Sequence, residues 1–192
     1  MKKDAIITLP NSHLRQKSQR VHVITDETRQ LVADMTSASI DWENSRPHEI
    51  SAALAAVQID QLERVVIVRE DFDDKDNRTF IPLINPEIVK YEGQLVSDYE
   101  GCLSVSGRIY GKVPRYSRVR VKALDINGNT IRLKADGFLA RVLQHEIDHC
   151  NGIVFIDRIR DDTSAFYQLD EKGELQPVDY DKHIKTNRIL WD

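Results

Sequence analysis

The chain has 192 residues, of which 41% are hydrophobic and 30% are charged. These values are ordinary for a globular domain, and this length allows one compact core that buries about two thirds of the surface exposed by the unfolded chain. With 27 basic and 31 acidic side chains the formal net charge is -4, which argues against a broad nucleic-acid-binding surface.

The first stretch, MKKDAIITLPNSHLRQKSQRV, contains no apolar run of signal-peptide length. No stretch of the sequence approaches the roughly 20 apolar residues that span a bilayer. Only two cysteines occur, Cys102 and Cys150, which are too few for a disulfide scaffold in a domain of this size. We therefore expect a soluble, cytoplasmic protein that does not interact with a membrane.

Residues 25–43 are predicted to form the first long helix. Thr25 is a suitable N-cap, and Asp26 and Glu27 suit the positive end of the helix dipole. Apolar residues recur at helical spacing, namely Leu31, Val32, Met35 and Trp42. The helix should lie outside the core with this face turned inward.

Three stretches that follow are predicted to form strands. VVIVRE (65–70) and TFIPLINPEIV (79–89) are β-branched and apolar, and the prolines of the second stretch suggest edges or bends. RVRVKALDINGNTIRLKAD (118–136) alternates in character on both sides of NGN, and Asn127-Gly128 is a favoured composition for a tight hairpin turn. We expect short, mostly antiparallel strands.

A second helix is predicted from about Gly137 to Cys150, with Asp136 near its start and Asn151-Gly152 as a left-handed stop. Its apolar residues cover most of its circumference, so it should be buried: they are Phe138, Leu139, Val142, Leu143 and Ile147. Its polar residues must then find buried partners. The expected fold class is α+β, with the strands around this central helix.

This central helix carries a pattern typical of a metal site. In QHEIDH (144–149), His145 and His149 are four residues apart and share one helix face, while Glu146 is rotated by about 100°. Two such histidines can bind one ion, which lowers the pKa of a bound water, and the carboxylate can accept the proton while a carbonyl is attacked. The pattern indicates hydrolysis of an amide-like bond. The alternative is a pair of core histidines with satisfied hydrogen bonds.

An open catalytic metal site needs a third protein ligand. Candidates downstream lie in a charged tail: Glu171, Glu174 and His183. Upstream, YEGCLSVSG (99–107) places Cys102 at the end of an extended segment beside two glycines. A thiol there can ionise next to a cation, although a lone cysteine is more often a small buried hydrophobic residue. The residues alone leave both possibilities open.

Three motifs together resemble the peptide deformylase family: SAALAAVQ at 51–58, EGCLS at 100–104 and QHEIDH at 144–149. Their order and spacing are those of the family, and the resemblance extends over about residues 5–160. Its enzymes remove the formyl group from the N-terminal methionine of nascent chains. The resemblance implies a catalytic domain over residues 1–165, with residues 166–192 as a C-terminal extension of the same domain.

The same resemblance implies roles for individual residues. The metal ligands would be Cys102, His145 and His149, and Glu146 would transfer the proton. Gln58 and the backbone N–H of Leu103 would donate hydrogen bonds to the oxyanion that forms on the formyl oxygen. The family's physiological metal is typically ferrous iron, which zinc, nickel or cobalt can replace.

The resemblance also implies how substrate binds. The methionine would enter an apolar pocket bordered by Ser51, Ala53, Leu54, Phe138 and Val142, and the substrate backbone would add as a strand beside the 51–54 segment. The partners implied are nascent formyl-methionyl polypeptides, with transient ribosome association and no nucleic-acid specificity. Taken singly, Phe138 and Val142 are equally typical of ordinary core.

The sequence departs from the family at several positions. Ser51, Ala53 and Asp60 stand where the family has glycine, which serves where a backbone approaches a ligand or adopts an unusual dihedral angle. The added side chains can narrow the substrate groove. Ser106 replaces a frequent proline, and Cys150 replaces a usual leucine and is expected to pack in the core.

These departures keep two alternatives open. One is a metal-binding relative that has lost or redirected its activity. The other is a zinc peptidase identified only by its helix motif, which leaves EGCLS and LAAVQ unexplained.

Overall fold

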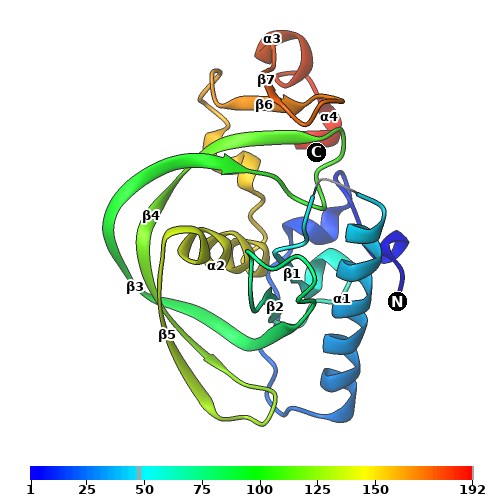
Figure 1. The fold of residues 1–192 in the computed structure, drawn as a ribbon, viewed down its shortest axis with the longest axis vertical. Coiled ribbons are helices and arrows are strands. Elements are labelled where there is room, and N and C mark those ends of the chain that lie inside the picture. Colours follow the sequence, from blue (N-terminus) through cyan, green and yellow to red (C-terminus); the bar gives the residue numbers. More distant parts are fainter. Residues whose placement is uncertain (47–48, 192) are drawn as a thin grey trace.

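The computed structural model describes residues 1–46 and 49–191, and Asp192, the last residue of the expected extension, lies outside these ranges. In the described part, a curved antiparallel sheet of seven strands wraps around one buried helix, and a longer helix lies on the outside (Figure 1). The predicted α+β class with a central helix is confirmed. Within the described residues, no helix combines the length and the apolar character needed to cross a membrane.

The strands run in the order β1-β2-β3-β4-β6-β7, and β5 pairs with β4 beside this path. Their bounds are β1 (Ala53–Ala55), β2 (Val65–Arg69), β3 (Phe80–Glu100), β4 (Ile109–Leu124), β5 (Thr130–Asp136), β6 (Phe166–Leu169) and β7 (Leu175–Pro177). The α-helices are α1 (Asp26–Asn44), α2 (Gly137–Cys150), α3 (Tyr180–His183) and α4 (Arg188–Trp191). Short 3-10 turns cover Lys3–Ala5, Ser12–Arg15, Ala56–Ile59 and Phe155–Ile159.

Two of the strands are much longer than the short strands expected from the sequence. β3 has 21 residues and β4 has 16, and they pair with each other along most of their length. Three shifts of register in this pairing, the first between Ile84 and Glu87, let the ribbon bend without ending. The predicted bends are therefore present, but they curve two continuous strands around α2 (Figure 1).

The β4–β5 hairpin is confirmed, but its turn is not closed by Asn127 and Gly128 alone. The N–H of Asp125 donates to the carbonyl of Asn129 (2.9 Å), and Gly128 donates back to the carbonyl of Asp125 (3.0 Å). Only Gly128 takes a positive φ, of 85°. The Asp125 carboxylate accepts from the N–H groups of Asn127 and Asn129, which stabilises this three-residue loop.

α2 begins and ends where the sequence predicts, and it is the centre of the core. It contacts β1, β2, β3, β4 and β5, and its residues from Ala140 to Cys150 are all buried. Gly152 follows at a φ of 75°, as expected for a left-handed stop. Phe138 is the exception among the predicted core residues, because it lies in the first turn and is 52% exposed.

α1 packs its apolar face against the sheet as predicted. Met35 is fully buried, and Leu31, Val32 and Trp42 pack on the same cluster. A buried ion pair joins the end of α1 to β2, because the Arg69 guanidinium donates to the Glu43 carboxylate at 3.1 Å.

The tail after residue 165 extends the sheet and completes part of the core. β6 pairs with the first residues of β4, and β7 pairs with β6. Ile184 and Leu190 are buried, and Trp191 packs on the same cluster, so these apolar residues fasten the tail to the core. Ile189, in the same segment, is 50% exposed and is not part of this cluster.

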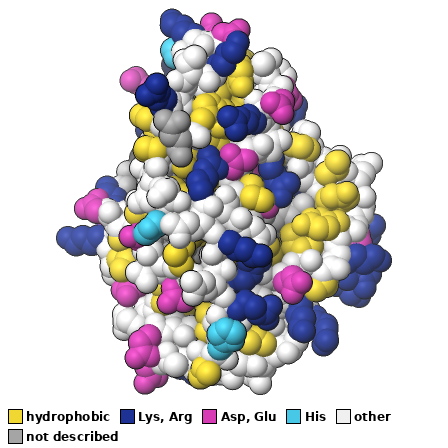
Figure 2. Space-filling model, turned by 180° about the vertical axis from the view of Figure 1, so that it is seen from behind, with side chains coloured by type: hydrophobic (Ala, Val, Ile, Leu, Met, Phe, Trp, Pro, Cys, Tyr) yellow, Lys and Arg dark blue, Asp and Glu magenta, His cyan; other side chains and the backbone are white. Residues whose placement is uncertain are grey.

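The outer face of the β3–β4 ribbon is open to solvent. Leu95 of β3 and its partner Tyr116 of β4 are large apolar side chains that remain exposed on it. Figure 2 shows hydrophobic side chains gathered over this part of the molecule, with Lys and Arg side chains at its edge. The sheet therefore has one face on α2 and the other toward water, as antiparallel sheets commonly do.

Candidate metal centre

Three side chains that can ligate a metal converge on one point beside α2. His145 and His149 come from successive turns of the helix, and Cys102 comes from the segment after β3. Their ligating atoms all lie within 4.8 Å of one another, and the Cys102 Sγ is 3.2 Å from the His149 Nε2. The downstream candidates in the tail are not part of this group. Among the described residues, this is the only such cluster of three or more.

Hydrogen bonds orient one of these histidines for metal binding. The His145 Nδ1 lies 3.0 Å from the Glu100 Oε2, an acceptor, so Nδ1 carries the proton and Nε2 keeps a free lone pair. Glu100 is the last residue of β3, two positions before Cys102. One short segment therefore supplies both a ligand and the group that orients another.

A buried network of charges holds Glu100 in place. Arg115 donates to both of its carboxylate oxygens at 2.9 Å, and Arg141 donates to one of them at 2.7 Å. Burial disfavours the charged carboxylate, but the hydrogen bonds from Arg115 and His145 outweigh it and lower the pKa of Glu100 well below its usual range. Arg115 also donates to Asp148 on α2, which further ties β4 to the helix.

Glu146 lies next to the ligands and is buried beside them. Its side chain is buried, and no hydrogen-bond donor for its Oε2 is found in the described ranges. Burial raises the pKa of Glu146 to about 7 in the absence of an ion. A buried carboxylate oxygen without a donor is costly, so this atom is available for a water or a substrate.

Gln58 points its donor group at the same centre. The Gln58 Oε1 accepts from the Ala55 N–H at 2.9 Å, which turns the Nε2 toward Ser104 Oγ (3.2 Å) and Cys102 Sγ (3.6 Å). The backbone N–H of Leu103 has no acceptor in the part of the chain that is described. Two neutral donors, one side chain and one backbone, therefore lie beside Cys102, where they can stabilise an oxyanion.

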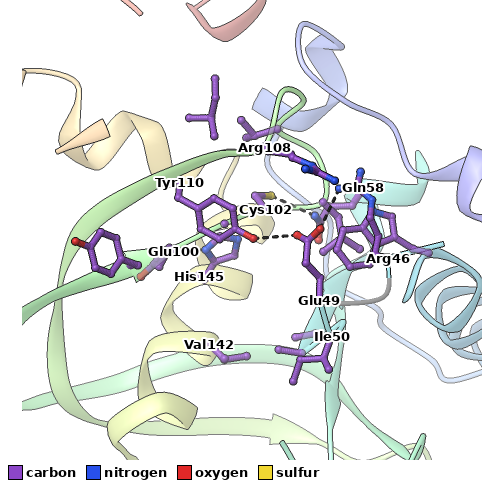
Figure 3. A pocket seen from close by; sticks show the side chains of 18 of the residues that line it. Arg46, Glu49, Ile50, Gln58, Glu100, Cys102, Arg108, Tyr110, Val142 and His145 are labelled. Carbon is purple, nitrogen blue, oxygen red and sulfur yellow. Dashed lines mark hydrogen bonds and ion pairs between the residues drawn. The ribbon is translucent and has the colours of Figure 1, made fainter. Parts of the chain in front are cut away.

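The centre opens into a cavity of about 670 Å³ between β1 and the segment that leads into β4 (Figure 3). Ala53, Phe138 and Val142 line it, together with Gln58 and Leu103. The side chains of Ser51 and Leu54 do not: both are fully buried, and Leu54 packs in the cluster under α1. The structure thus brings together three of the five residues expected around the substrate methionine.

Asp60 shows why glycine suits its position. Its φ is 64°, in the left-handed region that favours glycine, and it ends the 3-10 turn that carries Gln58. Its carboxylate accepts a hydrogen bond from the His13 ring, and its side chain is not part of the cavity lining. The replacement therefore affects the backbone behind the groove and leaves the groove itself unobstructed.

Several residues of the site could not be predicted from the sequence. Glu100 stands inside the quoted EGCLS motif, but no spacing rule connects it with His145. Arg115 and Arg141 lie in a strand and a helix, and their sequence patterns are equally typical of arginines exposed on the surface. The wall residues Glu49 and Tyr110 carry no sequence signal, because only the fold brings them to one cavity.

The ligand set fits a metal ion. Metal–nitrogen and metal–sulfur bonds of about 2.0 and 2.3 Å place the ligand atoms of one ion roughly 3–4 Å apart, close to the separation of Cys102 Sγ and His149 Nε2. One thiol and two imidazoles leave a coordination position free toward the cavity. The structure therefore supports a Cys-His-His metal site, with Glu146 and Gln58 beside it.

Comparisons with known proteins agree with this geometry. The family model described as polypeptide deformylase matches residues 3–165. A peptide deformylase of Thermomicrobium roseum is 45% identical over 172 residues, which cover 88% of this chain and 93% of that protein. One of Halothermothrix orenii is 42% identical over 146 residues, or 76% and 86% of the two chains. The crystal structure of a peptide deformylase from Synechococcus elongatus in complex with actinonin superposes with a TM-score of 0.73 at 36% identity, covering 82% and 80%.

Proposed function

This chain belongs to the peptide deformylase family, and we propose that three groups of its residues carry out the hydrolysis of an N-formyl group. They are a metal-binding set, a base and an oxyanion site. The activity itself is that of a metallo-hydrolase that removes the formyl group from formyl-methionyl chains. The observation that supports the division of roles is the convergence of the three ligands on one point, with Gln58, Glu146, Cys102 and His145 lining one cavity.

The metal-binding set consists of Cys102, His145 and His149. A metal held there supplies Lewis acidity, which polarises the formyl carbonyl and lowers the pKa of a water. The thiolate and two neutral imidazoles leave a divalent ion with a net charge of about +1, and sulfur favours softer metals. Ferrous iron is the proposed native metal, and zinc, nickel or cobalt can occupy the same ligands.

The base is Glu146. Its unpartnered Oε2 accepts a proton from the water that attacks the formyl carbon. When the bond between the formyl carbon and the nitrogen breaks, Glu146 returns this proton to the departing amine. The products are formate and a free amino terminus, and the glutamate regains its starting state.

The oxyanion site consists of the Gln58 Nε2 and the Leu103 N–H. Both are neutral donors, so they stabilise the negative charge that develops on the formyl oxygen without competing for the metal. The Gln58 amide is held by Ala55 and Ser104 before substrate binds, which removes the need to reorganise during the reaction.

The substrate methionine occupies the apolar part of the cavity between Ala53, Phe138 and Val142. Ser51 and Leu54 contribute through the backbone of their segment, along which the substrate chain adds as a strand. Nascent formyl-methionyl polypeptides are the proposed partners, met in the cytoplasm during transient association with ribosomes. Residues 1–165 form the proposed catalytic domain, with residues 166–192 as an extension of it.

The test is an anaerobic assay of the iron-loaded protein with formyl-Met-Ala-Ser beside unformylated Met-Ala-Ser. We expect formate from the first peptide and no cleavage of the second. Cleavage of a peptide bond in either substrate would indicate a peptidase. An iron-loaded, folded protein that releases no formate would indicate a relative without this activity.

A further inference from the structure

A hydrogen bond crosses the cavity in front of the metal ligands. The Tyr110 hydroxyl donates to the Glu49 Oε2 at 2.9 Å. Tyr110 belongs to β4, and Glu49 belongs to the segment between α1 and β1, so the two residues stand on opposite walls. Figure 3 shows the two side chains pointing toward one another across the cavity that also holds Cys102 and His145.

The Tyr110 side is held from two directions. The ring lies against Gly101, where an added Cβ would come within 2.7 Å of a ring carbon. The backbone of Tyr110 pairs with Tyr167 of β6. Burial and the bond to Glu49 raise the pKa of the Tyr110 hydroxyl well above its usual value, so it remains a donor at neutral pH.

The Glu49 side is held by Arg46. Its guanidinium donates to the other carboxylate oxygen of Glu49 at 3.1 Å and lies over the Trp42 ring, 5.0 Å from the centroid. Both ends of the Tyr110–Glu49 contact therefore have neighbours that hold them toward the cavity. Breaking the contact separates a donor from a charged acceptor, which costs more than breaking a bond between neutral groups.

A peptide bound with its formyl group at the metal must leave the cavity between these two walls. Its methionine is proposed to occupy the pocket at Ala53, Phe138 and Val142, and Tyr110 lines the same cavity. We infer that the following residue lies against the wall that carries Tyr110. A small side chain can pass while the contact stays closed. A large side chain needs the space that the Tyr110 ring and the Glu49 carboxylate fill.

We propose that the hydrogen bond between Tyr110 and Glu49 links the two walls of the substrate groove. This link selects peptides with a small residue directly after the formyl-methionine. The inference rests on the proposed function, because it assumes that a formyl-methionyl peptide lies in this groove. It assigns to Tyr110 and Glu49 a role in specificity and none in the hydrolysis itself.

The experiment compares kcat/KM of the metal-loaded full chain for formyl-Met-Trp-Ser and formyl-Met-Ala-Ser. Tyr110→Phe removes only the hydroxyl, and Glu49→Ala removes only the acceptor. Each variant should raise the ratio of kcat/KM for the tryptophan peptide to kcat/KM for the alanine peptide by about 10- to 100-fold, the value of one hydrogen bond to a charged acceptor. The double variant should gain no more than either single one, since both remove the same contact.

Tyr116→Phe is the matched control, because Tyr116 is on the outer face of the sheet and does not line the cavity. Calorimetric titration with the product peptides Met-Trp-Ser and Met-Ala-Ser measures the same preference without turnover. An unchanged ratio of kcat/KM for the two peptides in both single variants, or additive gains in the double variant, would overturn this proposal. A wild-type chain that releases no formate from the alanine peptide would refute the proposed function instead.

Discussion

At the scale of single residues, the two cysteines have different roles because their surroundings differ. Cys102 is partly exposed at the cavity, beside two imidazoles. Cys150 directly follows His149, but it is fully buried among apolar side chains, and burial raises its pKa to about 12. A thiol that stays protonated is a poor metal ligand, so only Cys102 is suited to bind the ion.

Cys102→Ala should therefore lose the metal, while Cys150→Ala should keep it. The measurement is the metal content per chain after dialysis against a weak chelator, with circular dichroism as the control for folding. One equivalent of metal in folded Cys102→Ala would contradict the ligand assignment, as would loss of metal from folded Cys150→Ala.

Glu146 is the second residue whose role can be isolated. Glu146→Gln keeps the size and polarity of the side chain but cannot accept the proton, so kcat should fall by about 10²- to 10⁴-fold. Metal content should stay at the wild-type value, because Glu146 is not a ligand. Turnover within a few-fold of wild type would refute its role as the base.

At the scale of elements, the first motif depends on α1. The Glu43 carboxylate at the end of the helix receives the Arg69 guanidinium of β2 and the N–H of Ser51, which begins the 51–58 segment. Arg69 and Glu43 are almost fully buried, with exposures of 0% and 2%. The motif that carries Gln58 is thus positioned by a helix and a strand outside it.

Glu43→Ala should lower the free energy of unfolding by about 3–5 kcal/mol, because it leaves Arg69 buried without its counter-charge. Urea denaturation gives this value. Glu92→Ala is the comparison, since it breaks an ion pair with Arg120 on the exposed ribbon and should cost far less. Equal losses of unfolding free energy in the two variants would show that the buried ion pair contributes no more to stability than the exposed one.

At the scale of the whole molecule, the tail contacts the rim of the cavity. β6 pairs with β4 directly beside Tyr110, and Leu169 and Gln168 donate to the carbonyls of Arg108 and Gly107 on the cavity rim. Arg15 near the other terminus donates to the Leu190 carbonyl at 3.0 Å. The tail should therefore unfold together with the rest of the domain.

Ile184→Ala should destabilise the whole domain by about 2–5 kcal/mol, because it leaves a cavity in a fully buried position. Ile189→Ala, five residues on and half exposed, should change stability by less than about 0.5 kcal/mol. Both are measured by thermal or urea unfolding, which should show a single transition. A separate early transition in Ile184→Ala would mean that the tail folds independently.

The sequence by itself determined the parts of this protein that depend on local chemistry. The helices at 26–44 and 137–150 follow from capping residues and apolar periodicity, and their predicted bounds agree with the structure to within one residue. The positions of His145, His149 and Glu146 on one helix follow from the same periodicity. Three motifs in order were sufficient for the resemblance to the family, which the comparisons confirm.

Only the tertiary structure decided which distant residues meet. Cys102 becomes the third ligand in place of tail residues because two long bent strands return the chain to α2, and bulges of this kind have no reliable sequence signal. The partner of His145, the charges around Glu100, and the contact of Tyr110 with Glu49 depend on the same bending. Periodicity is a property of neighbours along the chain, whereas a site is a property of neighbours in space, and the packing around α2 connects the two.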